Sequence, residues 1–118
     1  NDKIADSHLR DQIIQLNLNS QAFGLTLQRA SAESKSSGGV SPTSSMFKLY
    51  GTEQNKQRYD LLINILGAQG TGWEGDSFTE RELSVTREWL RSRANSIEGG
   101  TSEVQLNVIA KQVLKLPD

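Results

Sequence analysis

Hydrophobic residues recur every three or four positions over residues 7–32, which is the period of an α-helix with one buried face. The positions on that face are Leu9, Ile13, Leu16, Phe23, Leu27 and Ala30, with Ser20 filling the one gap. Ile14, Leu18 and Leu25 widen the stripe, so we expect this long helix to be buried on more than one side. Ser7 is the expected N-cap.

A second helix is predicted over residues 42–66, with Ser41-Pro42 at its start and a small-polar loop over residues 34–41 before it. Its middle, residues 51–58, is polar almost all round. Such a stretch either is solvated or faces a polar partner, and we favour solvent. Gly67 is expected to cap the helix in the left-handed conformation. The glycine-rich segment after it is expected to be a flexible connector.

Two capping-box patterns mark the starts of two further helices. Thr79-x-x-Glu82 opens a highly charged third helix, and Ser102-x-x-Gln105 opens a last helix that ends near Leu114. The predicted fold is therefore all-α, an antiparallel up-down helical bundle with short loops. At 118 residues the chain is long enough for a single domain.

The composition excludes several classes of protein. Thirteen basic and 14 acidic residues nearly balance, which argues against binding to nucleic acid. The absence of cysteine removes disulfides, thiolate metal sites and cysteine nucleophiles, and the single histidine, His8, rules out a multi-histidine metal site. No apolar run approaches the ~18 residues that would span a bilayer, and no signal-peptide pattern opens the chain. We expect a cytoplasmic protein without a membrane span.

The segment Gly99-Gly100-Thr101-Ser102-Glu103 is the strongest candidate for chemistry. Paired glycines let a backbone approach a ligand closely, and the helix that follows presents unpaired N–H groups and a positive dipole end. The segment therefore suits a phosphate or pyrophosphate group, although glycine pairs before helices are more often structural. Trp73 and Trp89 are interpreted as packing anchors, and no catalytic or metal-binding cluster stands out.

The sequence I-E-G-G-T-S-E-V-Q-L-N-V-I-A at residues 97–110, with V-L-K-L-P at residues 113–117, resembles the C-terminal signature of the acyl-CoA dehydrogenases. The order of helices and glycine loops upstream is similar too. The resemblance implies that residues 1–118 are most of the C-terminal helical bundle domain of such an enzyme. By the same resemblance, we expect the N-terminal helical domain, the middle β-domain and the first helix of the bundle to lie outside this chain.

The resemblance implies a flavoenzyme that uses FAD to form an α,β double bond in an acyl-CoA thioester. By position in the signature, Thr101, Ser102 and Glu103 are the expected FAD contacts, and Gly100 is expected to approach the substrate thioester. Gly67 matches a turn that reaches the flavin of a neighbouring subunit. Expected partners of the full enzyme are the acyl-CoA substrate, an electron-transfer flavoprotein and further subunits of a homo- or hetero-oligomer.

Two departures from the family pattern limit what the chain does alone. Asn64 and Ala68 replace a glutamine and a glycine of the turn around Gly67. Gly99 stands where many members carry the catalytic glutamate, and other members place that base on an earlier helix that this chain does not contain. We therefore assign no catalytic residue and expect the isolated chain to be inactive. The alternative is a non-catalytic helical interaction module whose glycines only shape a turn.

Overall fold

A computed structural model describes residues 4–37 and 44–117, and every regular element within them is helical. The elements are α1 (Ser7–Ser37), α2 (Ser44–Leu66), the 3-10 turn η1 (Gly67–Thr71), α3 (Glu80–Ser92), the 3-10 turn η2 (Arg93–Ser96), α4 (Ser102–Val108) and the π-helical turn η3 (Ile109–Val113). The predicted Ser41-Pro42 start of the second helix lies outside the described residues. Residues 34–37, predicted to be loop, continue α1.

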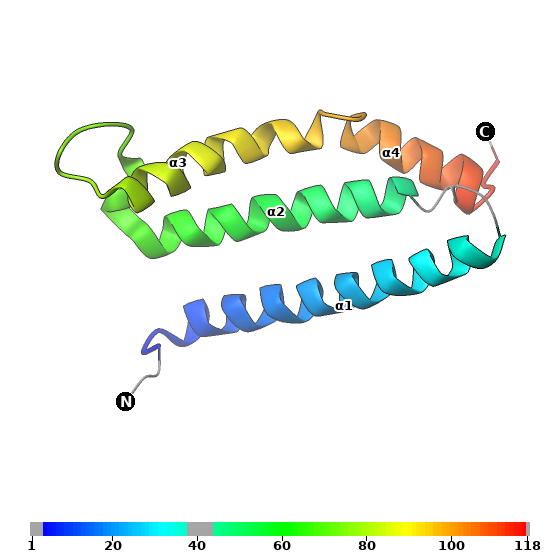
Figure 1. Cartoon of the computed structure of the whole chain (residues 1–118), viewed down its shortest axis with the longest axis horizontal. Coiled ribbons are helices and arrows are strands. Elements are labelled where there is room, and N and C mark those ends of the chain that lie inside the picture. Colours follow the sequence, from blue (N-terminus) through cyan, green and yellow to red (C-terminus); the bar gives the residue numbers. More distant parts are fainter. Residues whose placement is uncertain (1–3, 38–43, 118) are drawn as a thin grey trace.

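The helices lie in a row with α2 in the middle (Figure 1). On one side α1 runs antiparallel to α2, and on the other side α3, η2 and α4 follow one another along α2 (Figure 1). The all-α antiparallel fold class is confirmed. However, α3 and α4 point the same way, because the short turn between them continues the direction of the chain instead of reversing it.

Aromatic packing joins α1 to α2. The ring of Phe23 lies 6.2 Å from that of Phe47 and 5.3 Å from that of Tyr50, measured between centroids. Gly51 makes this approach possible, because a Cβ there would lie 3.3 Å from the Phe23 ring. The predicted inner stripe of α1 is half-buried at this seam, apart from the more exposed Leu27.

The prediction that α1 is buried on more than one side is wrong for this chain. Ile14, Leu18 and Leu25 are 51%, 56% and 66% exposed. They lie on the side of α1 opposite the Leu16–Phe23 stripe, and α2 covers only that stripe. The outer face of α1 is therefore an open apolar surface.

Capping residues explain where two helices begin. Asp6, not Ser7, is the N-cap of α1, because its carboxylate accepts the Leu9 N–H at 3.1 Å. At α3 the predicted capping box is confirmed: the Thr79 hydroxyl accepts the Glu82 N–H at 3.3 Å, and the Glu82 carboxylate accepts the Thr79 N–H at 2.7 Å.

The glycine-rich segment after α2 is ordered at its start, so the expected flexible connector is wrong there. Gly67 has a φ of 57°, which confirms the left-handed cap. Gly70 is buried, and its carbonyl accepts the Thr86 hydroxyl at 3.2 Å. Gly72 is buried against the Phe78 ring, which a Cβ would approach to 2.5 Å. Close packing, and not chain flexibility, accounts for Gly70 and Gly72.

Together, α3, η2 and α4 form one elongated segment, which we call the rod. The layer between α2 and this rod is mostly polar. Among the described residues, Leu61 and Leu83 are the only buried hydrophobic side chains. Residues 51–56 of α2 are half-buried, with Gly51 against α1 and with Glu53 and Asn55 paired with the rod. The prediction that residues 51–58 are solvated is therefore wrong for residues 51–56, whereas residues 57 and 58 are exposed. Within residues 4–37 and 44–117, no helix combines the length and the apolar character needed to cross a membrane.

Candidate functional site

The candidate site is the turn of residues 97–101, which joins η2 to α4 within the rod and which we call the glycine corner. Its paired glycines both have positive φ, 65° at Gly99 and 102° at Gly100. Gly100 has a second constraint, because a Cβ there would lie 2.7 Å from Nε2 of Gln105. Gly99 is exposed and Gly100 is half-buried, so the corner is partly open to solvent. Backbone geometry therefore favours glycine at position 99 and excludes a Cβ at position 100.

The first turn of α4 differs from the predicted capping box. Thr101, not Ser102, is the N-cap, and its hydroxyl accepts the Val104 N–H at 3.3 Å. The Gln105 side chain does not reach back to a cap N–H but donates to the Gly99 carbonyl at 2.7 Å. The expected Ser102–Gln105 box is thus wrong by one position, because the left-handed glycines put Thr101 in the extended conformation of an N-cap.

The three residues expected to contact FAD have different environments. The Thr101 hydroxyl caps α4, and the Ser102 hydroxyl donates to Oε1 of Glu53 at 3.4 Å. Glu103 is exposed, and its pKa is lowered chiefly because its carboxylate accepts its own backbone N–H, with help from the Thr101 hydroxyl. The carboxylate of Glu103 and the backbone of the turn are therefore what the site presents outward.

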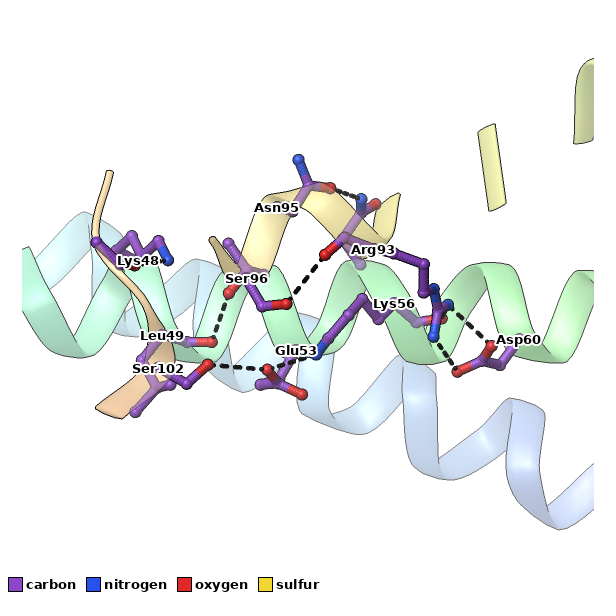
Figure 2. A network of polar contacts seen from close by, with 12 residues as sticks. Lys48, Leu49, Glu53, Lys56, Asp60, Arg93, Asn95, Ser96 and Ser102 are labelled. Carbon is purple, nitrogen blue, oxygen red and sulfur yellow. Dashed lines mark hydrogen bonds and ion pairs between the residues drawn. The ribbon is translucent and has the colours of Figure 1, made fainter. Parts of the chain in front are cut away.

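A set of polar contacts from α2 supports the turn and the rod (Figure 2). Lys48 donates to the Gly100 carbonyl, and the ammonium of Lys56 lies 2.8 Å from Oε1 of Glu53. Further along, the Asn55 amide donates to Asn95 at 2.9 Å.

The same set ends at Asp60 (Figure 2). Its Oδ1 accepts Nε1 of Trp89 at 2.7 Å and the Arg93 guanidinium at 2.9 Å. Sequence reasoning missed this set, although the run of polar side chains at residues 51–58 was its visible signal. Trp89 is half-buried and anchors the rod to α2, as the sequence predicted. The same prediction is wrong for Trp73, which is 55% exposed and has the Arg87 guanidinium 5.6 Å from the centre of its ring.

The remaining predicted site residue lies elsewhere. Gly67 follows the C-terminal end of α2, whereas Gly100 contacts Lys48 near the N-terminal end of that helix. The intervening 18 residues of helix correspond to ~27 Å. Within one chain the structure therefore does not bring Gly67 together with Thr101, Ser102 and Glu103.

An all-α unit with a glycine-paired turn before its last helix matches a known protein domain. Residues 2–114 match the family described as "Acyl-CoA dehydrogenase, C-terminal domain". Because this match spans nearly the whole chain, the chain belongs to that family. Enzymes of this family are oxidoreductases that depend on FAD and form oligomers.

Two curated relatives are similar over part of the chain. The acyl-CoA dehydrogenase IpdE1 of Mycolicibacterium smegmatis is 34% identical over 70 residues, and IpdE1 of Mycobacterium tuberculosis is 33% identical over 70 residues. Each alignment covers 59% of this chain and 17% of the relative, so the chain matches about a sixth of each relative's length. No solved structure matches the chain.

Proposed function

We propose that the chain is the C-terminal helical part of a FAD-dependent acyl-CoA dehydrogenase, in which it supplies flavin-site and subunit contacts. The observation that carries the proposal is the turn at Gly99 and Gly100, two left-handed glycines that lead directly into the capped first turn of α4. The family match supports the reading of that turn as a cofactor site.

The groups in this turn fit the chemistry of a dinucleotide. Gly100 offers backbone without a Cβ, and the amides that open α4 favour an anionic or carbonyl oxygen. We propose that Thr101, Ser102 and Glu103 contact FAD, that Gly100 lies beside the substrate thioester, and that Gly67 contacts a flavin held by a neighbouring subunit. When bound, FAD supplies the oxidant that accepts the hydride from Cβ of the acyl group.

Removal of the Cα proton needs a base that this chain does not offer at the turn. Gly99 has no side chain, and the neighbouring Glu98 carboxylate lies 2.6 Å from the Arg91 guanidinium. That ion pair holds the Glu98 carboxylate beside Arg91 of α3. We therefore propose that the isolated chain is inactive, and that the complete enzyme acts on acyl-CoA and passes its electrons to an electron-transfer flavoprotein.

The parent protein that contains this chain provides the test. Purified parent protein is expected to carry FAD, seen by its visible absorbance, and to bleach when an acyl-CoA is added anaerobically. The 118-residue chain alone is expected to do neither. A parent protein that folds but carries no FAD, and whose visible absorbance is not bleached by any acyl-CoA, would contradict the proposal and favour the interaction module.

Variants at Thr101 test whether its hydroxyl is needed for flavin binding. Thr101→Ala removes both the hydroxyl beside the cofactor and the N-cap, a loss of about 0.5–2 kcal/mol of helix stability, whereas Thr101→Ser keeps both. We expect reduced FAD occupancy for Thr101→Ala and near-normal occupancy for Thr101→Ser. In an interaction module, neither variant would change the flavin content.

A further inference from the structure

We propose that Lys48 and Gln105 are positioning residues that set the direction of the amides in the Gly99–Thr101 turn, with Glu53 fixing the helical turn that follows. This inference rests on the proposed function, because it says how the chain prepares the same site for FAD.

The two carbonyls of the glycine pair are each held by a different side chain. Gln105, only 8% exposed, donates its Nε2 to the Gly99 carbonyl at 2.7 Å. Lys48, half-buried on α2, donates its ammonium to the Gly100 carbonyl from 52 residues away in the sequence. A hydrogen bond from a charged donor is stronger than a neutral one, so Lys48 is the stronger of the two restraints.

Planar trans peptides convert these restraints into amide directions. In each such peptide the N–H points opposite to the C=O of the preceding residue. The N–H of Gly100 therefore points away from Gln105, and the N–H of Thr101 points away from Lys48. Gln105 is buried and Lys48 is half-buried on α2, so both donors approach the glycine pair from the packed side of the turn. We infer that the two successive N–H groups face away from that packing.

Glu53 secures the residue that follows. Its Oε1 accepts the Ser102 hydroxyl at 3.4 Å and lies 2.8 Å from the Lys56 ammonium, so Lys56 holds the carboxylate in place (Figure 2). Lys48 and Glu53, which contact Gly100 and Ser102, both lie on α2. Their contacts are to the residues immediately before and after Thr101. The direction of the Thr101 amide is thus set from α2 by Lys48, and that of the Gly100 amide from α4 by Gln105.

The test uses the FAD-loaded parent protein and measures the FAD dissociation constant by the change in flavin fluorescence. Lys48→Met keeps the length of the side chain and removes the donor, whereas Lys48→Arg keeps a charged donor. Lys35→Met, on the exposed end of α1, is the matched control. We expect FAD binding to be about tenfold weaker in Lys48→Met, largely recovered in Lys48→Arg and unchanged in the control.

A second readout separates positioning from general stability. Backbone 15N relaxation at the Gly100 and Thr101 amides is expected to show larger motion in Lys48→Met and in Gln105→Met, in FAD-free protein whose melting temperature stays close to that of the control. Unchanged FAD affinity and amide motion in both variants would overturn the inference while leaving the proposed function intact. A loss of affinity that follows the melting temperature and is not recovered by Lys48→Arg would also overturn it. Unaltered parent protein that binds no FAD would instead contradict the proposed function.

Discussion

At the scale of single residues, the chain after the last helix contains an unusual backbone conformation. Lys115 has a φ of 53°, the only positive φ at a non-glycine among the described residues. The Leu116 N–H reaches back to the Ala110 carbonyl at 3.0 Å, and the Leu114 N–H reaches the Ile109 carbonyl at 2.9 Å. This is a left-handed helix ending, in which glycine is the preferred residue at the position that Lys115 occupies.

Lys115→Gly is therefore expected to stabilise the protein. Glycine adopts this conformation without the steric cost that a Cβ brings, and the gain in unfolding free energy is expected to be about 0.5–1 kcal/mol. Gln112→Gly, within the π-helical turn, is the control and should destabilise by about 1 kcal/mol. Denaturant titrations at one protein concentration measure both. A stability loss for Lys115→Gly as large as that of the control would contradict the assigned conformation.

At the scale of the elements, α2 is organised by polar contacts more than by apolar ones. The capping position of Gly67 predicted a helix that ends at Leu66, as observed. The sequence could not decide what the polar middle of α2 faces, because the same polar residue types occur in solvated positions and in pairs across a helix interface. Only the arrangement of the rod shows that Glu53 and Asn55 have partners in residues 95–102.

Local signals predicted some parts of the site and not others. The capping box at Thr79 and Glu82 depends on residues within one turn, so the sequence predicted it correctly. The comparable pattern at Ser102 and Gln105 was displaced by one residue because the left-handed glycines before it place Thr101 in the N-cap conformation, which the local pattern does not show. Restraint of the turn by Lys48 joins residues 52 positions apart, and no local pattern encodes such a contact.

The Glu82 capping contact predicts a pH dependence. Hydrogen bonds from the Thr79 N–H and then from its hydroxyl lower the pKa of Glu82 below its usual value of 4.5. Its contribution to stability is therefore complete above that pH and is lost as the pH falls through the lowered pKa of the folded state. Carboxyl NMR titration should show the lowered pKa, and in Thr79→Ala the pKa should rise part of the way back. A Glu82 pKa that is the same in both proteins would contradict the capping role.

The Arg93–Asp60 ion pair is expected to contribute more to stability than the Arg91–Glu98 ion pair. Asp60→Ala removes acceptors from both Trp89 and Arg93 at a half-buried position, so we expect a loss of about 1–2 kcal/mol. Glu98→Ala removes a partner of Arg91 in which both side chains are more than half exposed, and should change stability by less than about 0.5 kcal/mol. Equal losses in the two variants, compared by thermal unfolding, would contradict this assignment.

At the scale of the whole molecule, the chain forms an open layer and not a closed bundle. Its radius of gyration is 18.0 Å, compared with about 13.5 Å for a compact domain of this length. Residues 12–28 of α1 contain no charged side chain, and the exposed stripe of Ile14, Leu18 and Leu25 lies within them. An uncharged apolar face can meet a copy of itself without electrostatic repulsion.

We therefore expect the isolated chain to self-associate through this face of α1. Sedimentation velocity should show a mass that increases with protein concentration, and Leu18→Glu should shift the population toward monomer, because it places like charges opposite each other. Gln28→Glu adds the same charge on the flank of α1 and should have a much smaller effect. A monomer at every concentration, or equal effects of the two variants, would contradict the prediction.

The contacts of α2 with the rod have a mechanical consequence. They are spread over residues 48–60, roughly three turns, and each joins a specific pair of atoms. Sliding α2 along the rod by one helical turn would break all of these contacts together. The glycine corner therefore keeps its place beside α2 only in this register, so a change that shifts the register anywhere over residues 48–60 would also move Gly100.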